Sequence, residues 1–500
     1  MLPYVVQYPL PEQFTVSSWE KAWEASGNHA FVLESGKSGK YSFLGIRPFS
    51  TIRGGESRAI IEEEDGAVHK LVGERPLDAV KAWMAPYVSP RVDGLPKFVG
   101  GIVGYWGYDV VRMIERLPTL AKADLPCPDY CFMMFDRIWV IDHEQHQLYC
   151  AVHQRIRTDD EDRTDEELRR LYGLAAKAAD RMKVQWDQMM VDDAIAASSR
   201  AKASRLAEDY ANNQLQIDVE ALEGVYTEFS RDRYMSAVQQ IQEYIRAGDV
   251  FQVNLSVRQS CKLDAKPEQI YEWLRYLNPS PYMGFLKLPD FQLVSASPEL
   301  LVQLDGNRVR TRPIAGTRPR GANAEEDERI RRKLLDNEKE RAEHIMLVDL
   351  ERNDLGRISR YGTVRVDELM AIEYYSHVMH IVSEVTSELM PGKDVFDVIA
   401  AVFPGGTITG APKIRTMEII EELEPTRRGP YTGSMGWIDY NGNMEFNIII
   451  RTLLAEGGIG HVQAGAGIVI DSDPAREYTE SLNKAKALWK AVQYASLGGE

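Results

Sequence analysis

Short runs in which apolar and polar residues alternate dominate the first part of the chain. Examples are AFVLES, YSFLGI, AIIEEE and DRIWVIDHEQHQLYCAV, and Gly, Ser or Pro residues separate many of them. A period of two places one face of a strand against a core, and the breakers between runs mark turns. The pattern predicts antiparallel strands joined as hairpins over residues 1–156.

A helical period replaces this alternation further along the chain. In RDRYMSAVQQIQEYIRAG, the apolar side chains share one stripe and Gly248 ends the segment, which predicts an amphipathic helix followed by the strand VFQVNLSVRQS. We then expect strands at QLVSASPELLVQL, RVRTRPIAG, MGWIDY, FNIIIRTLL and HVQAGAGIVI. Long helices are expected from Asn323 to Leu350, Gly392 to Val402, Pro412 to Leu423 and Pro474 to Tyr494.

The segment between these two parts has a different character. Residues 157–224 are rich in charged residues and Ala, with helical spacing but few bulky apolar positions, so we interpret them as an exposed helical linker. The chain then divides into an N-terminal region (1–156), this linker and a larger region (225–494). Strands in hairpin order, without strict strand and helix alternation, predict an α+β fold with mainly antiparallel sheets.

Composition narrows the classes of function. The 500-residue chain has a formal net charge of -16 and four scattered cysteines. An acidic protein of this kind lacks a chain-wide nucleic-acid surface, and so few cysteines fit a reducing compartment better than a disulfide scaffold. No run of 18 or more apolar residues and no signal sequence is evident, so we expect a cytoplasmic protein with no membrane partner.

Two pairs of glutamates are spaced for metal binding. Glu340 and Glu343 are three residues apart in one predicted helix, as are Glu477 and Glu480 in another, with Lys484 one turn further on. Each pair can present two carboxylates along one helix face. Exposed acidic faces are common, but apolar residues flank both pairs, so an interior cleft is also possible, and oxygen ligands of this kind suit Mg²⁺.

Two glycine-rich segments resemble nucleotide-binding loops only in part. In GGTITGAPK, which contains Thr407, the lysine comes two residues too late for a phosphate-binding loop, and the GAG of Gly465 to Gly467 is followed by a strand instead of a helix. Both features argue against a nucleotide. An anion at the helix start or a plain capped loop fits the first segment, and close ligand approach or packing fits the second.

A histidine pair and a missing motif complete the chemistry visible in the residues. His377 and His380 are three apart in SHVMHIVSEV, and they fit a metal pair, core histidines or one catalytic acid. No G-x-S-x-G elbow and no cysteine in a comparable setting is present. The chain is therefore not expected to hydrolyse glutamine or esters itself.

Taken together, several motifs resemble the chorismate-utilising enzymes. These are FQVNLS, NPSPYM, SPELLV, TRPIAGTR, KERAEHIMLVDLERNDLG, YSHVMHIVS, FPGGTITGAPK, GPYTGS, FNIIIRT, QAGAGIV and EYTESLNKA, and they extend over residues 225–492. The N-terminal LESGKSGKYSFLGIRPF is similar to the amino-terminal region of anthranilate synthase and aminodeoxychorismate synthase large subunits. The resemblance implies an anthranilate-synthase-like fold whose antiparallel sheets pack face to face, flanked by helices.

The resemblance assigns roles to the paired acids and the glycines. Glu343 and Glu480 would hold Mg²⁺ directly, and Glu340 and Glu477 would act through water, with the metal on the ring carboxylate of chorismate. The other carboxylate would be held by a second group of residues. That group comprises Tyr431, Arg451, Gly465, Gly467 and Lys484. An arginine fork suits such a planar anion.

The same resemblance places His380 near the departing C4 hydroxyl, where an imidazole can donate a proton or a hydrogen bond. Thr407, Gly316 and Thr317 would line this pocket, whereas His377 is interpreted as structural. Water-using relatives carry a lysine where this chain has Gln252. Ammonia from a separate glutamine amidotransferase subunit is therefore the expected nucleophile.

Two products are compatible with this mode of binding chorismate. Anthranilate synthases make anthranilate for tryptophan, whereas aminodeoxychorismate synthases make 4-amino-4-deoxychorismate for 4-aminobenzoate and folate. Ala315 is typical of the former, because many of the latter have a lysine there. Asn254, Gly405, Thr409 and Asn447 are typical of the latter. Several segments outweigh one residue, so we expect the 4-amino product, with anthranilate as the alternative.

A further pocket is suggested by the same family. The LES segment with Glu34 and Ser35, and NPSPYM with Asn278 and Met283, match a tryptophan pocket of anthranilate synthases. The resemblance leaves open whether such a pocket regulates, holds tryptophan structurally or is filled by packing.

Overall fold

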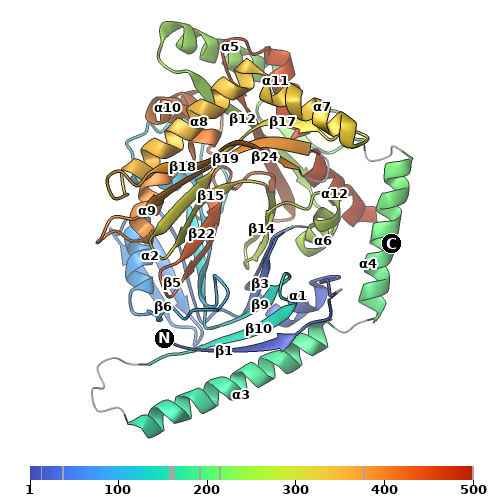
Figure 1. Ribbon diagram of the computed structural model, residues 1–500. Coiled ribbons are helices and arrows are strands. Elements are labelled where there is room, and N and C mark those ends of the chain that lie inside the picture. Colours follow the sequence, from blue (N-terminus) through green and yellow to red (C-terminus); the bar gives the residue numbers. More distant parts are fainter. Residues whose placement is uncertain are drawn as a thin grey trace.

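The computed structural model describes residues 1–12, 14–36, 39–156, 164–190, 193–212, 216–374 and 378–497. Two large sheets form its centre (Figure 1). In spatial order, the first contains β1 (Leu2–Pro9), β10 (Gln147–Gln154), β9 (Arg137–Asp142), β3 (Tyr41–Ile46), β2 (Ala30–Glu34), β13 (Tyr282–Lys287), β14 (Phe291–Ser297), β23 (Thr452–Glu456), β24 (Ile459–Ile468), β12 (Gln252–Lys262) and β11 (Tyr226–Thr227). The short β20 (Gly410–Ala411) pairs with β12.

The second sheet is built in the same way. It contains β17 (Ile314–Pro319), β19 (Val378–Glu388), β16 (Arg308–Arg312), β15 (Leu300–Asp305), β22 (Met444–Asn447), β21 (Ser434–Asp439), β7 (Gly101–Trp106), β8 (Tyr130–Phe135), β4 (Ser50–Gly55), β5 (Arg58–Glu63) and β6 (Val68–Val72), with β18 (Arg365–Tyr374) paired to β19. Neighbouring strands in both sheets are antiparallel. The predicted α+β class with mainly antiparallel sheets is confirmed.

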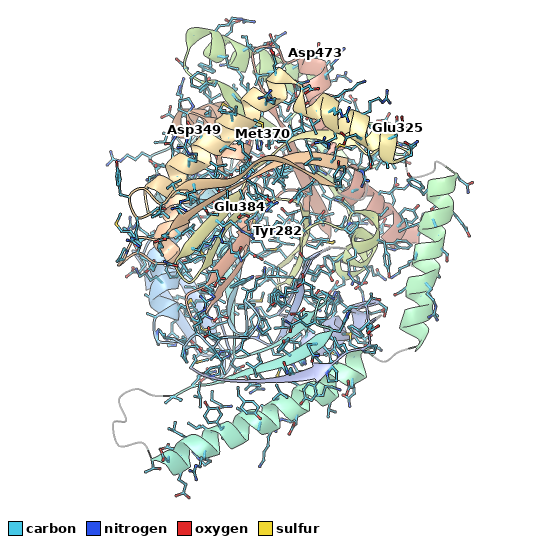
Figure 2. The ribbon with its side chains drawn as sticks, in the orientation of Figure 1. Tyr282, Glu325, Asp349, Met370, Glu384 and Asp473 are labelled. Carbon is cyan, nitrogen blue, oxygen red and sulfur yellow. The ribbon has the colours of Figure 1, made fainter. Side chains whose placement is uncertain are left out.

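Apolar side chains arrange these elements in layers. Phe31 and Leu293 of the first sheet and Phe135 and Trp437 of the second lie in one buried cluster between the sheets, and the rings of Phe98 and Trp437 stack at 4.8 Å. Helices cover the outer face of each sheet with two further cores. Figure 2 shows side chains filling the space between the sheets. Removing these aromatic surfaces from water stabilises the stacked arrangement.

Helices flank the sheets largely where the sequence predicted them. The α5 helix (Arg231–Ala247) is capped by Ser230 at its start and by Gly248, with φ of 82°, at its end, so this prediction is confirmed. Other helices beside the sheets are α1 (Glu20–Ser26), α2 (Pro76–Met84), α6 (Pro267–Leu277), α9 (Val395–Val402) and α10 (Lys413–Leu423), together with the 3₁₀ segments Tyr108–Met113 and Gly406–Ile408.

Two predicted long helices are each divided. The stretch from 323 to 350 forms α7 (Ala324–Leu335), which ends at its C-cap Asp336, and α8 (Glu338–Gly356). Asn337 caps α8 by accepting a 3.1 Å bond from the N–H of Glu340. The stretch from 474 to 494 forms α11 (Pro474–Asn483) and α12 (Lys486–Leu497), with the break at Lys484. An unbroken helical period cannot reveal such breaks.

Two predicted strands are also divided, and each half joins a different sheet. QLVSASPELLVQL becomes β14 in the first sheet and β15 in the second, with Pro298 and Glu299 at the crossing. FNIIIRTLL becomes β22 and β23, and its crossing contains Arg451 at the unusual φ of 52°. The chain therefore passes twice between the sheets at neighbouring points, since β14 pairs with β23 and β15 with β22.

The charged linker contains two helices, α3 (Asp165–Met190) and α4 (Asp193–Ala211). The prediction of an exposed helix is wrong for α3, because six of its side chains, including Met182 and Trp186, are buried against the first sheet. The helix runs along β1 and β10 (Figure 1). Several residues on the buried face of α3 are alanines, so the sequence showed only a weak hydrophobic period there.

Regions 1–156 and 225–494 meet within both sheets, through β2 with β13 and β7 with β21.

Candidate active site

Four acidic side chains converge from two helices. The pKa of Glu343 is raised because its carboxyl is half-buried and, to a smaller extent, because Glu340, Glu477 and Glu480 repel its charge. Burial likewise raises the pKa of Glu477, whose Oε1 accepts a 2.7 Å bond from the hydroxyl of Ser472. The structure thus brings the two predicted pairs, on α8 and α11, into one electrostatically coupled group.

This group fits a hard cation through the chemistry of its oxygen donors and its excess negative charge. Glu340 is bonded by Arg318 and Glu480 by Lys484, so two of the four carboxylates have cationic partners. Within the described ranges, no set of three or more acidic, cysteine or histidine side chains is already gathered as metal ligands. Mg²⁺ needs only one or two carboxylates when water and substrate complete its octahedron.

A cationic and glycine-lined region faces the carboxylates. Burial lowers the pKa of Arg451, whose charge interacts with Tyr431 and Glu480. Among the residues that the structure describes, Arg451 has no ion-pair partner, which leaves its guanidinium free to bind an anion. Lys484 donates a 2.8 Å bond to the carbonyl of Gly465. These predicted residues therefore lie near one another.

Gly467 allows a close approach in the same region. A Cβ at Gly467 would lie 2.1 Å from the side-chain nitrogen of Gln252. The Gln252 side chain therefore packs against the backbone of Gly467, in space that a larger residue at position 467 would need. Gly465 has a similar neighbour, since its Cβ would lie 2.8 Å from Oδ1 of Asn254.

His380 and the β17 strand form another side of the site. The Nδ1 atom of His380 lies 3.0 Å from the hydroxyl of Thr317. Burial, helped by the charge of Arg451, lowers the pKa of His380 to about 4. The imidazole is therefore neutral near pH 7 and can offer a hydrogen bond there more readily than a proton. The structure does not describe residues 375–377, so His377 lies outside its described residues.

A bulge shapes the strand that carries Ala315. Ala315 pairs with Ile381 and Thr317 with His380, so Gly316 is an extra residue between two registered pairs. Its φ of 58° is in the left-handed region, and an added Cβ would lie 2.3 Å from Oε2 of Glu340. Glycine is required here on both counts. The bulge thereby links the acidic pair on α8 to the pocket of His380.

The sequence analysis missed Glu299, which lies at the crossing from β14 to β15. Its side chain is buried, and this burial raises its pKa to about 7, although the nearby Thr407 hydroxyl and Lys484 partly oppose the shift. The Oε1 of Glu299 and the Oγ1 of Thr407 are both buried without a well-aligned hydrogen bond. A charged residue directly after proline within an otherwise apolar run was the available signal.

The predicted tryptophan pocket is assembled only in part. Glu34, Ser35 and Met283 line a cavity of about 70 Å³, whereas Asn278 ends α6 and does not line it. Glu34 already accepts bonds from Tyr271, at 2.8 Å, and from Arg275, at 2.7 Å. An ammonium group entering this cavity would have to compete with that guanidinium for the carboxylate.

Comparison with known sequences identifies the class of protein. Residues 28–490 match the family described as chorismate binding enzyme, and the chain belongs to this family. It is therefore a chorismate-utilising enzyme. Within that class the chain is 47% identical to aminodeoxychorismate synthase component 1 of Bacillus subtilis, over 97% of this chain and 96% of that protein.

Anthranilate synthases are also similar. The chain is 45% identical to anthranilate synthase component 1 of Thermus thermophilus, over 94% of this chain and 93% of that protein. Among solved structures, anthranilate synthase component I of Streptococcus pneumoniae has a TM-score of 0.73 at 32% identity and covers 91% of this chain and 93% of that one. The predicted anthranilate-synthase-like fold is confirmed. None of the helices described has the length and apolar composition to cross a membrane.

Proposed function

We propose that the protein is the chorismate-aminating component of an aminodeoxychorismate synthase, which forms 4-amino-4-deoxychorismate from chorismate and ammonia. The observation that carries the proposal is the 47% identity, over nearly the full length of both chains, to a protein with that name. The neighbouring acidic and cationic residues support it, because chorismate carries two carboxylates that need cationic partners.

In this proposal, Glu343 and Glu480 hold Mg²⁺, and Glu340 and Glu477 act through water. Bound Mg²⁺ supplies a positive charge for the ring carboxylate and polarises the substrate. The half-buried Glu343 and the repulsion among the four acids favour such a cation. On the other side, Arg451 and Tyr431 hold the enolpyruvyl carboxylate together with the backbone around Gly467 and with Lys484.

We propose Glu299 as the group that protonates the departing C4 hydroxyl, so that the C4–O bond breaks and the hydroxyl leaves as water. The ammonia that forms the new C–N bond then loses one proton to solvent and becomes the amine. A carboxyl with a pKa of about 7 is matched to donating a proton at neutral pH. Neutral His380 then offers a hydrogen bond to the same oxygen, and Thr407 orients Glu299. This division of roles differs from an imidazole acid, because the pKa of His380 is about 4.

Ala315 bears on how the nitrogen enters. An alanine cannot add covalently to the ring, so ammonia or a nucleophile other than residue 315 must act. Ala315 and the similarity to anthranilate synthases, at 45% identity for the Thermus thermophilus protein, favour the second candidate function, in which anthranilate and pyruvate are formed. The two candidate reactions use the same substrate-binding residues and differ in the ring carbon that receives nitrogen.

Ammonia is proposed to come from a glutamine amidotransferase subunit. The word "component" in the names of the relatives implies a partner, and the sequence offers no nucleophile elbow for glutamine hydrolysis. All four cysteines are free, which is consistent with a reaction in the reducing cytosol.

The test is to incubate purified protein with chorismate, Mg²⁺ and a large excess of ammonium salt at neutral pH, with and without aminodeoxychorismate lyase. We expect 4-aminobenzoate only when the lyase is present, because the lyase converts only the 4-amino product. Anthranilate fluorescence without lyase would instead support the second candidate. A Glu343→Gln variant is the matched blank, since it keeps the side-chain shape and removes the charge proposed to hold Mg²⁺.

A further inference from the structure

A buried ion pair lies in the loop that follows α10 and leads to Tyr431. The residue Arg428 is only 2% exposed. Its Nε atom donates a 2.9 Å bond to one carboxylate oxygen of Glu424, and its Nη2 atom donates a 2.8 Å bond to the other. Removing two charges from water is costly, so a buried pair of this kind is weak evidence for a role in stability. The contacts that it makes with its surroundings are more informative.

The other N–H groups of this guanidinium reach three separate segments of the chain. Nη1 of Arg428 donates to the carbonyl of Ile408 at 2.9 Å and to the hydroxyl of Thr432 at 3.2 Å, and Nη2 donates to the carbonyl of Asn254 at 2.7 Å. Together with the two bonds to Glu424, these contacts use every N–H that an arginine side chain possesses. The guanidinium is therefore held in one orientation.

Each of the three segments carries one residue of the proposed substrate site. These residues are Thr407, next to Ile408; Tyr431, next to Thr432; and Gly467, which pairs with Asn254 across the ladder of β12 and β24. One side chain thus connects parts of the site that are far apart in the sequence. Because a guanidinium is planar and its donor directions are fixed, a shift of one segment would strain the bonds to the other two.

Tyr431 is also contacted directly. The guanidinium carbon of Arg428 lies 5.6 Å from the centre of the Tyr431 ring, within the range of a cation–π contact. The next residue, Thr432, has a φ of 59°, in the left-handed region that a β-branched residue rarely adopts. Strained backbone of this kind persists only where its surroundings hold it in place. The bond from Arg428 to the Thr432 hydroxyl is one such restraint.

The N-terminal region holds the same loop from another direction. The N–H of Tyr108 donates a 2.7 Å bond to the carbonyl of Gly429, and the N–H of Gly429 donates a 3.1 Å bond to Oδ2 of Asp109. The Tyr108 ring lies 5.1 Å from the guanidinium carbon of Arg428. Residues from both ends of the chain therefore fix the position of the Arg428 side chain.

We propose that Arg428 is a positioning residue for substrate binding, which holds Tyr431 in a fixed place relative to Thr407 and Gly467 before chorismate arrives. The proposal rests on the proposed function, since it concerns the binding site for that substrate. Arg428 does not bind the substrate carboxylate itself, because its N–H groups are used and Glu424 balances its charge. A site that is already ordered loses less conformational entropy on binding, so Arg428 should affect substrate affinity more than the chemical step.

The first test is Arg428→Lys in the full-length protein. Lysine keeps the positive charge beside Glu424 but has fewer N–H donors and no planar fork, so it cannot hold all three segments at once. We expect the KM for chorismate to rise about tenfold, equivalent to about 1.4 kcal/mol, with a smaller change in kcat. Steady-state consumption of chorismate with Mg²⁺ and excess ammonium salt measures both constants. An unchanged KM in a folded variant would overturn the proposal.

The matched control is Arg275→Lys. The Arg275 side chain is 13% exposed and, like Arg428, donates to a carboxylate and to a backbone carbonyl, those of Glu34 at 2.7 Å and Val16 at 2.8 Å. Within the described part of the chain, its hydrogen bonds reach no residue proposed to bind chorismate. Arg275→Lys should lower the thermal stability and leave KM unchanged. An equal rise of KM in both variants would reflect general destabilisation and would overturn the proposal.

A second variant decides the question if Arg428→Lys does not fold. Arg428→Met combined with Glu424→Gln removes both charges, so no unpaired charge is left buried. The glutamine oxygen can still accept the bonds that Ser256 donates from its N–H and its hydroxyl. We expect a folded protein whose KM for chorismate remains raised. Recovery of the original KM in this variant would mean that Arg428 only balances the charge of Glu424.

A double-mutant cycle tests whether Arg428 acts through Tyr431. In a Tyr431→Phe background, Arg428→Lys should raise KM by a smaller factor than in the unmodified protein, because the hydroxyl that it positions is absent. Effects that simply multiply would show that the two residues act independently and would overturn the proposal. The proposed function fails in a different way, since the unmodified protein would then consume no chorismate in the presence of ammonium salt.

Discussion

A single carboxyl, that of Glu299, sets an expected limit on activity at high pH. Because its pKa is about 7, the proton proposed for the C4 hydroxyl is present below pH 7 and lost above it. We predict that kcat falls as pH rises through 7. In Glu299→Gln, kcat should drop by about 10²–10⁴, and this limb of the pH profile should disappear. Steady-state kinetics with ammonium salt, corrected for the ammonia fraction, measure both effects.

The control is Asp439→Asn. Burial also raises the pKa of Asp439 to about 7, but its carboxylate accepts a bond from the N–H of Val99, within the second sheet. Its replacement should leave the pH limb in place. Stability gives a second check: the folded-state pKa of Glu299 exceeds the usual 4.5, so its destabilising effect appears as pH rises from about 4.5 to 7. The free energy of unfolding of Glu299→Gln should therefore decrease less than that of the unmodified protein over this pH interval.

Arg451 is predicted to determine substrate affinity. Arg451→Lys keeps a positive charge but loses the planar fork that matches a carboxylate. We expect the KM for chorismate to rise about a hundredfold, equivalent to about 2.7 kcal/mol, with a smaller change in kcat. Arg427→Lys is the control, because Arg427 lies 3.9 Å from Asp109 and serves an internal contact. An unchanged KM in Arg451→Lys would contradict the proposed anion site.

At the scale of the element, the break between α7 and α8 sets the position of the acidic pair. Asn337→Ala removes the cap of α8, the helix that carries Glu340 and Glu343, and should cost about 1 kcal/mol. We predict weaker Mg²⁺ binding as well. Asn323→Ala is the matched control, since Asn323 caps α7 through a 2.9 Å bond from the N–H of Glu326. It should cost similar stability without affecting Mg²⁺, as denaturation and calorimetric titration would measure.

The facing helices α8 and α11 also predict a pH dependence of metal binding. The pKa values of Glu343 and Glu477 are raised above the ordinary 4.5 in the absence of metal, and a bound cation would lower them. Mg²⁺ affinity should therefore increase with pH just above this value, with protons released on binding. Calorimetry at pH 5.5 in two buffers of different ionisation enthalpy would count these protons, and Glu343→Gln should release fewer. Equal observed heats in the two buffers would mean that no protons are released and would contradict the prediction.

The elements were predictable where the pattern is local. The period of α5 and its terminal Gly248 identified that helix. In contrast, QLVSASPELLVQL is apolar on both sides of Pro298, so no local signal separates β14 from β15. The choice of sheet depends on distant partners, β13 and β23 for β14, and β16 and β22 for β15. The motifs therefore identified site residues but did not predict where they lie in the fold. Glu299 was missed because its burial follows from the crossing between β14 and β15.

On the scale of the whole molecule, the shared sheets predict one cooperative unit. Separating regions 1–156 and 225–494 would leave β2, β13, β7 and β21 without their neighbours and would expose the aromatic core between the sheets. We predict that residues 225–500 alone are not stably folded and bind a hydrophobic dye. The intact chain should unfold with coincident near- and far-ultraviolet circular dichroism. A fragment with a sharp thermal transition would contradict this prediction.

The two crossings between sheets have a consequence for how such enzymes can diversify. Glu299 and Arg451 are fixed by connections that cannot shift without disturbing both sheets, whereas Ala315 lies beside a bulge in β17, a terminal strand of its sheet. The first positions are mutationally constrained, and the second is free to vary. Selection can therefore change the reaction at the ring through residues near the bulge, while the residues that bind the substrate stay the same. A designer seeking a new product would begin by varying the bulge.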